Sequence, residues 1–155
     1  MNVHTYDRDW IARHIPHSGR MCLLDAVAAC DATAIRCHAD SHRAADNPLR
    51  AHGRLGAAVG IEYAAQAMAV HGAILMPAAE KPKAGFLASV RGVELLTDRL
   101  DTVDAPLIID AERLSGNEST ILYRFEVSAA GRALLRGRAA VIVAPHLPAG
   151  AGALA

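Results

Sequence analysis

The longest apolar stretch of the chain, from Ala57 to Met76, limits what this sequence can fold into. It has the length of a helix and is rich in alanine. Apolar residues occupy nearly every side of it, so several sides must be enclosed by other elements. Pro77 ends the stretch, because proline cannot continue a helix. The rest of the chain must therefore provide a surface that wraps around one buried helix.

Three polar side chains within this stretch, Glu62, Gln66 and His71, argue against a membrane-spanning helix. A charged group at the centre of a bilayer costs about 2.5–3.5 kcal/mol on insertion scales. Gly60 and Gly72 each cost about 1 kcal/mol of helix stability relative to alanine, so they predict the close approach of a neighbouring backbone. We interpret the stretch as the core helix of a soluble domain.

The segments on either side of the helix alternate between apolar and polar residues, as strands do. Before the helix, the pattern predicts a short helix, an extended segment and a strand, at 7–14, 21–27 and 35–41. After it, the pattern predicts a strand with a bulge at Gly92, a hairpin and a last strand, at 86–95, 107–127 and 135–143. This order predicts an α+β fold in which an antiparallel sheet wraps around one long central helix.

The length of the chain indicates how many domains it forms, and its net charge argues against one class of function. The chain has 155 residues, and domains most often have about 100–150. We expect a single domain over residues 1–145, with 146–155 as a flexible C-terminal tail. Sixteen basic and sixteen acidic residues cancel, so no net field attracts nucleic acid. The N-terminus lacks a basic start followed by an apolar run, which indicates a cytoplasmic protein without a secretory signal.

Cysteine and histidine spacing gives no sign of a metal centre. An odd number of cysteines without C-x-x-C spacing fits neither a disulfide framework nor a zinc site, so we expect reduced and mostly buried thiols at Cys22, Cys30 and Cys37. His38, Asp40 and His42 share one face of a predicted strand and could bind a metal. Alternating polar residues are, however, what an exposed strand face requires. We therefore expect no metal and no cofactor.

The apolar helix carries the residues that chemistry could use. Glu62 and Gln66 are four residues apart and so lie on one face. A carboxylate in apolar surroundings is costly unless it is paired or protonated. Glu62 is therefore either a structural residue that reaches water or a backbone amide at an edge, or a functional acid. His71 lies off this face, and a hydrogen-bonded core histidine accounts for it.

Two segments in a fixed order resemble motifs of the β-hydroxyacyl-acyl-carrier-protein dehydratases, which have the hot dog fold. Residues 15–25, IPHSGRMCLLD, are similar to the opening motif L-P-H-x-x-P-(M/F)-L-L-(L/V)-D, with Arg20 where proline is usual. Residues 56–66, GAAVGIEYAAQ, are similar to the helix motif P-G-x-x-x-(E/D)-x-x-x-Q. The VGIEY wording at 59–63 resembles the divergent branch associated with aryl polyene biosynthesis, the ApeP-like branch. The resemblance covers roughly residues 12–145.

This resemblance implies the roles of the site residues. His52 takes the C2 proton of a 3-hydroxyacyl thioester, and Glu62 orients or protonates the hydroxyl that leaves from C3. Unpaired N–H groups at the helix start near Gly56 and Ala57 bind the thioester oxygen, with Gln66 also on the substrate side. His17 in the opening motif is expected to be structural, with a hydrogen bond that fixes its turn against the sheet.

The resemblance also implies the partners. The substrate arrives as a phosphopantetheine-linked acyl thioester on an acyl carrier protein, in fatty acid or polyene biosynthesis. Carrier proteins usually need basic residues near the tunnel mouth, and the candidates are Arg43, Arg50, Arg54 and Lys83. The histidine and the acid come from opposite subunits, and a sheet edge favours pairing, so a dimer at least is expected.

Two other functions stay open. An acyl thioesterase of the same fold would use the carboxylate to activate water. A non-catalytic or half-site subunit would pair with an active dehydratase. His52 stands ten residues before Glu62, closer than in the resembling family, so the loop is shortened and the half-site subunit remains a rival. Whether the assembly is a homo-oligomer or a heterodimer is likewise open.

Overall fold

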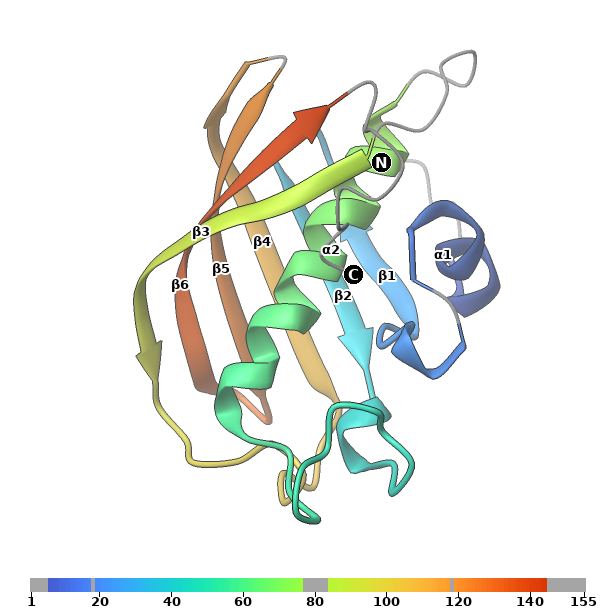
Figure 1. The fold of residues 1–155 in the computed structure, drawn as a ribbon, viewed down its shortest axis with the longest axis vertical. Coiled ribbons are helices and arrows are strands. Elements are labelled where there is room, and N and C mark those ends of the chain that lie inside the picture. The colour runs from blue at the N-terminus through green and yellow to red at the C-terminus, as the bar shows by residue number, and fades with distance from the viewer. Residues whose placement is uncertain (1–5, 18, 77–83, 118, 145–155) are drawn as a thin grey trace.

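The computed structural model describes residues 6–17, 19–76, 84–117 and 119–144 (Figure 1). Its elements follow in the order α1 (Arg8–His14), η1 (Gly19–Met21), β1 (Ala26–Cys30), β2 (Ala34–Ala39), η2 (Ser41–Arg43), η3 (Ala57–Val59), α2 (Gly60–Leu75), β3 (Ala84–Leu95), β4 (Leu107–Gly116), β5 (Thr120–Ala129) and β6 (Arg132–Ala144), where η marks a 3-10 turn. The tail predicted at 146–155 lies outside the described residues.

One six-stranded sheet, in the order β1-β2-β4-β5-β6-β3, forms the body of the protein. Every neighbouring pair is antiparallel. The sheet curls around α2, and α1 lies beside β1 (Figure 1). The predicted α+β architecture, an antiparallel sheet wrapped around one long helix, is confirmed.

Helix α2 is the centre of the core, as its apolar surface predicts. The buried residues of α2 are Gly60, Tyr63, Ala64, Gln66, Ala67, Met68, Val70 and His71. The 19 residues of Ala57–Leu75 are long and apolar enough to cross a membrane, and 44% of the 18-residue window that meets this criterion is buried inside the domain. Core helices meet the same criteria, and the enclosing sheet gives α2 that position (Figure 1).

Close packing at the start of α2 explains one of its two glycines. A Cβ added to Gly60 would lie 2.4 Å from Cδ2 of Leu135, so the first turn of the helix packs directly on β6. The predicted close approach is present there, although the neighbour is a side chain rather than a backbone. Gly72 is exposed with nothing within 4 Å of such a Cβ. The prediction was wrong for Gly72.

The strands after the helix confirm their predicted pattern. β4 and β5 pair as a hairpin, and β5 buries Tyr123, Phe125 and Val127 on the inner face. Gly92 has a φ of 60°, and the pairing of β3 with β6 shifts register between Arg91 and Glu94. Because a left-handed φ favours glycine, the predicted bulge falls at the residue that permits it.

The strands before the helix are shorter than predicted, and hydrogen bonds to side chains explain why. The segment predicted to be extended from residue 21 becomes a strand only at Ala26, because the Leu23 N–H donates to Oε1 of Gln66 at 2.9 Å and cannot join a ladder. The strand predicted to reach 41 ends at Ala39, because Ser41 begins a 3-10 turn. The Ser41 hydroxyl donates to the Leu23 carbonyl at 2.8 Å.

The Gln66 side chain is the main polar tie between α2 and the opening segment. Besides accepting from Leu23, its amide Nε2 donates to the Met21 carbonyl at 2.7 Å. Gln66 is fully buried, and its amide bonds the backbone on both sides of Cys22. A single side chain therefore satisfies two backbone groups that the opening segment cannot pair within a strand.

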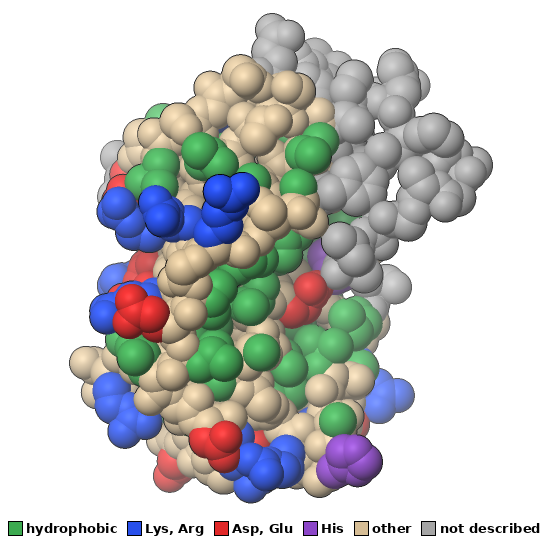
Figure 2. All heavy atoms as spheres, turned by 60° about the vertical axis from the view of Figure 1, so that its left-hand side comes forward, with side chains coloured by type: hydrophobic (Ala, Val, Ile, Leu, Met, Phe, Trp, Pro, Cys, Tyr) green, Lys and Arg blue, Asp and Glu red, His purple; other side chains and the backbone are tan. Residues whose placement is uncertain are grey.

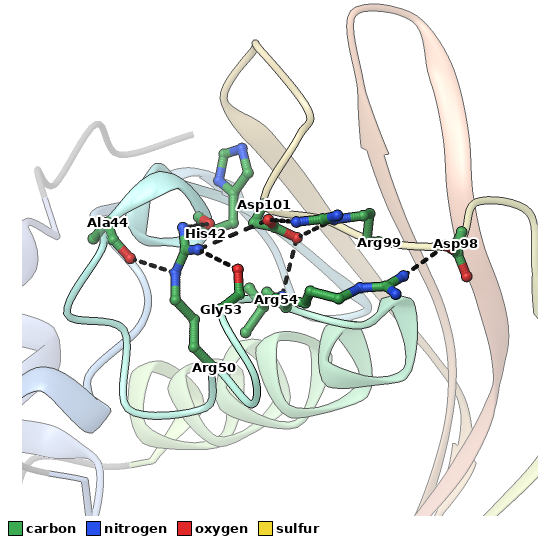
Figure 3. Close-up of polar contacts among 9 residues, drawn as sticks. His42, Ala44, Arg50, Gly53, Arg54, Asp98, Arg99 and Asp101 are labelled. Atoms are coloured by element: carbon green, nitrogen blue, oxygen red, sulfur yellow. Dashed lines mark hydrogen bonds and ion pairs between the residues drawn. The ribbon is translucent and has the colours of Figure 1, made fainter.

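An acidic anchor holds the loop that leads into α2 (Figure 3). Asp101 accepts from the Leu55 N–H at 3.0 Å and from Nε of Arg99 at 2.9 Å, and Nη1 of Arg50 lies 3.8 Å from its second oxygen. The hydrogen-bonded Arg99 guanidinium holds the pKa of the Asp101 carboxyl well below its usual range, and the Leu55 N–H lowers it further. The loop end thus has a fixed position immediately before the helix.

Replacing Gln66 by leucine should destabilise the fold. Gln66→Leu keeps the side-chain volume and leaves the Leu23 N–H and Met21 carbonyl without partners, which costs about 1–3 kcal/mol of the free energy of unfolding. Met68→Leu, at another buried position of α2, serves as the control and should cost less than about 1.5 kcal/mol. Urea unfolding of both variants measures the difference, and equal losses would contradict the role of the amide.

Replacing Asp101 by asparagine should cost stability in a pH-dependent way. Its pKa is lower in the folded than in the unfolded chain, so its stabilisation is complete above the ordinary value of 3.8 and is lost as pH falls toward the folded value. Asp101→Asn should lower the free energy of unfolding at neutral pH by about 1–3 kcal/mol. Urea unfolding at neutral pH and at about pH 3 should show the gap to wild type narrowing in acid.

The matched control is Asp98→Asn, which removes an exposed carboxylate that forms an ion pair with Arg54. An exposed pair of this kind contributes roughly 0–1 kcal/mol, so little change is expected. A gap for Asp101→Asn that stays constant between the two pH values would show that the carboxylate charge is not what stabilises the loop.

Candidate active site

Glu62 pairs with a histidine from the opening segment. It lies in the first turn of α2, where the helix dipole favours a carboxylate. Its Oε1 is 3.1 Å from Nε2 of His17, and the side chains of Glu62 and His17 are 25% and 5% exposed. The carboxyl is thus bonded on one side and partly open on the other. We call these two residues the His17–Glu62 pair.

The partner of His17 differs from the one expected. The sequence predicted a hydrogen bond between this histidine and the sheet, whereas the bond goes to the central helix. The backbone turn after α1 brings it there, because the Ile15 N–H still bonds the Ile11 carbonyl while Ile15 itself is extended. Nδ1 of His17 is buried and has no hydrogen-bond partner among the described residues.

His52 lies elsewhere on the surface of this chain. It is exposed, with a φ of 51°, in a tight turn closed by mutual hydrogen bonds between Ala51 and Arg54. Within the described part of one chain it makes no hydrogen bond to Glu62. The histidine that contacts the acid in the same subunit is therefore His17, and His52 as the catalytic base stays a prediction.

The helix start offers a different amide from the one predicted. The Ala57 N–H donates to the Asp98 carbonyl at 3.2 Å, so it is already occupied, and Gly56 bridges to Arg99 on the same connection. The next amide, that of Ala58, belongs to an exposed residue and makes no hydrogen bond to the described residues. The unpaired N–H group expected near Ala57 is therefore that of Ala58, and not that of Ala57 itself.

A buried polar network that the sequence reasoning missed supports the helix beside Glu62. The Tyr63 hydroxyl donates to Oγ of Ser41 at 2.7 Å and accepts from Nδ2 of Asn47 at 3.2 Å. Asn47 also donates to the Ser41 carbonyl at 2.9 Å. Burial raises the pKa of Tyr63. The available signal was Tyr63 itself, since a buried tyrosine needs a partner for its hydroxyl.

Two further histidines, His71 and His42, have structural positions. Nε2 of His71 donates to the Asp31 carbonyl at 2.8 Å, so Nδ1 accepts from the Tyr123 hydroxyl at 2.8 Å, and burial lowers the pKa of His71. The predicted core histidine is confirmed. His42 is fully buried in η2, where Nε2 bonds the Val103 carbonyl, so it does not share an exposed strand face with His38.

The potential metal ligands of the described ranges are scattered. No group of three or more histidine, cysteine or acidic residues in these ranges is placed to hold a metal. The three cysteines are free, with Cys22 and Cys37 buried and Cys30 half-buried. Burial raises the pKa of Cys37 to about 12, so this thiol is a poor nucleophile.

The side of α2 away from the sheet is apolar and incompletely covered. Hydrophobic side chains run down the middle of the face that Figure 2 turns toward the reader. Apolar residues left partly open on α2 and on the edge strand β3 are Ile61, Ile74, Leu87, Val90 and Val93. Glu62 is on the same helix, so a molecule that covers this apolar side also approaches its carboxyl.

Comparisons with solved structures show the fold. A chain of the dehydratase heterocomplex ApeI:P from Xenorhabdus doucetiae matches with a TM-score of 0.76 at 24% identity, over 86% of this chain and 90% of the other. A thioesterase from Pseudomonas aeruginosa matches at 0.58 and 13%, over 78% and 81%. A thioesterase from Haemophilus influenzae matches at 0.58 and 12%, over 81% of each chain. The predicted hot dog fold is confirmed.

Comparison with family models is more specific. No curated protein matches the chain. The ApeP-like model, described as ApeP dehydratase, matches residues 10–150 and so includes both segments that resemble the dehydratase motifs. Because the match spans nearly the whole domain, this chain belongs to the ApeP-like dehydratase family.

Proposed function

We propose that the protein dehydrates 3-hydroxyacyl thioesters carried by an acyl carrier protein, with Glu62 as a proton-transferring group. The observation that carries the proposal is a partly open carboxyl in the first turn of an otherwise apolar helix, held by a buried histidine. Membership of the ApeP-like dehydratases supports the reaction class. A cytoplasmic pathway that makes fatty acids or aryl polyenes is the proposed setting.

Dehydration of a 3-hydroxyacyl thioester needs a base, an acid and hydrogen-bond donors for the thioester oxygen. A base removes the proton from C2, an acid protonates the hydroxyl on C3, and the C3–O bond breaks to release water and leave a C2–C3 double bond. Charge develops on the thioester oxygen in between, and backbone N–H groups stabilise such an oxygen. The Ala58 amide at the start of the helix, which makes no hydrogen bond to the described residues, suits that oxygen and lies one residue from the predicted Ala57.

The open carboxyl oxygen of Glu62 supports its proposed role. Oε1 bonds His17, whereas Oε2 makes no hydrogen bond to the described residues. The neighbouring partly buried residues on α2, Val59 and Ile61, are apolar. An acyl chain lying along this surface would be shielded from water, and proton transfer would occur next to it.

A second subunit is part of the proposal. β3 is an edge strand, and the open side of α2 is apolar, so both features favour a partner chain. The similar structure from Xenorhabdus doucetiae is a dehydratase heterocomplex. We propose that this chain likewise pairs with a related dehydratase, and that His52 as the second catalytic group acts across the subunit boundary.

The carrier protein is expected to contact basic residues near the loop before α2. Arg54 is half exposed and pairs with Asp98 at 2.8 Å, and Arg43 pairs with Asp40 and Asp104. Arg50 bonds the Ala44 carbonyl at 2.8 Å, which fits a structural role better than docking (Figure 3). Lys83 lies outside the described residues. Arg54 is therefore the first choice for a docking test.

Glu62→Gln should abolish most activity. The amide can still accept from His17 and cannot transfer a proton, so enoyl formation from a 3-hydroxyacyl carrier protein should fall by about 10²–10⁴-fold. Mass spectrometry of the carrier-bound acyl group measures it. Glu94→Gln, on the exposed face of β3, is the control and should retain activity. Wild-type rates in Glu62→Gln would reject the assignment.

An assay with and without a partner subunit should distinguish a dehydratase from a thioesterase and from a non-catalytic subunit. The chain is assayed alone and mixed with a related dehydratase subunit, and an enoyl product that depends on Glu62 is expected in at least the mixture. Free acid without enoyl product would indicate a thioesterase. Enoyl formation by the mixture that is unaffected by Glu62→Gln would indicate a non-catalytic subunit. Activity that survives His52→Ala would reject His52 as the base.

A further inference from the structure

We infer that His17 is a positioning residue for Glu62: it binds one carboxyl oxygen, Oε1, and leaves the other, Oε2, to exchange protons with the substrate. The inference rests on the proposed function and deepens it. It assigns a histidine of the same subunit to the site, in addition to the predicted His52.

The geometry of the pair supports a fixed hydrogen bond. Nε2 of His17 lies 3.1 Å from Oε1 of Glu62, and the histidine side chain is only 5% exposed. The Glu62 side chain is 25% exposed, so the carboxyl extends from a buried contact toward the surface. A buried group that bonds a partly open one can orient it without competing for the substrate.

The unpaired nitrogen of His17 fixes the direction of this hydrogen bond. Nδ1 is buried and has no partner among the described residues, so a proton on Nδ1 would be a buried donor without an acceptor. Unpaired buried N–H groups are rarer in proteins than unpaired acceptors. The ring therefore carries its proton on Nε2 and donates it to Oε1. Transfer to or from the substrate must then use Oε2.

The segment around His17 is anchored on both sides. Before it, the Ile15 N–H bonds the Ile11 carbonyl at 3.1 Å, and Ile15 is buried. After it, the Cys22 N–H bonds the Gly19 carbonyl at 3.1 Å, and Gln66 holds the next turn of the chain. The imidazole is thus preorganised, and positioning within a fraction of an ångström is what proton transfer requires.

The test compares two replacements of His17 in the protein or complex that shows activity. His17→Leu removes the donor, and kcat should fall by about 10²-fold with KM nearly unchanged, because the carboxyl loses orientation rather than substrate contacts. His17→Gln places an amide N–H near the position of Nε2 and should recover kcat to within about tenfold of wild type. Thermal unfolding of each variant sets an assay temperature at which all are folded.

His71→Leu is the matched control, because it removes a buried, hydrogen-bonded histidine that interacts with Tyr123 and Asp31 and not with Glu62. It should lose stability and keep kcat. The inference is overturned if His17→Leu keeps the wild-type kcat, if His17→Gln is as slow as His17→Leu, or if folded His71→Leu is equally slow.

A measurement independent of activity separates this inference from the proposed function. Nitrogen NMR of the histidine rings should show His17 protonated at Nε2 and unprotonated at Nδ1, with its Nε2 signal changed by Glu62→Ala. A folded wild-type protein that forms no enoyl product with any partner would reject the proposed function. A His17 ring protonated at Nδ1 would reject the inference, whatever the activity.

Discussion

The position of the opening segment depends on one buried amide. Gln66 is fully buried in the middle of α2, so both ends of its side chain need partners. They find them in the Leu23 N–H and the Met21 carbonyl, at 2.9 Å and 2.7 Å. These two backbone groups cannot also pair with a neighbouring strand, so residues 21–23 do not form a strand. The contact also fixes the position of the backbone that follows His17. Because Glu62 is one helical turn before Gln66, the same contact brings the histidine next to the acid.

The second constraint is the apolar surface of α2, which one sheet encloses only in part. The inner side packs so closely on β6 that Gly60 has no room for a Cβ beside Leu135. The outer side keeps apolar residues partly open (Figure 2), and β3 beside them is an edge strand in the described part of the sheet. A helix that is apolar all round is most stable when covered all round. Burial of this apolar surface therefore favours a covering molecule on this side.

Local pattern predicted much of the fold and drew attention to one residue of the candidate site. The helix, the β4–β5 hairpin and the bulge at Gly92 follow from periodicity and from glycine, which act within a few residues. The apolar surroundings of Glu62 are compatible with a structural or a functional carboxyl, and the resemblance of residues 56–66 to the dehydratase helix motif favours the functional one. The partner of His17 is 45 residues away in sequence. Its position depends on Gln66 and on the turn after α1, and no periodicity in the sequence encodes such long-range contacts.

An unpaired ring nitrogen does not by itself indicate a functional histidine. His42 also has a buried Nδ1 without a partner in the described part of the chain, and its Nε2 bonds the backbone carbonyl of Val103 at 3.0 Å. That bond links two segments of backbone, and its acceptor is a carbonyl that cannot transfer a proton. His17 differs because its partner is a carboxyl that remains partly open. Losing one hydrogen bond at Nδ1 costs stability in both residues. Of these two histidines, only His17 uses its remaining bond to hold a partly open carboxyl.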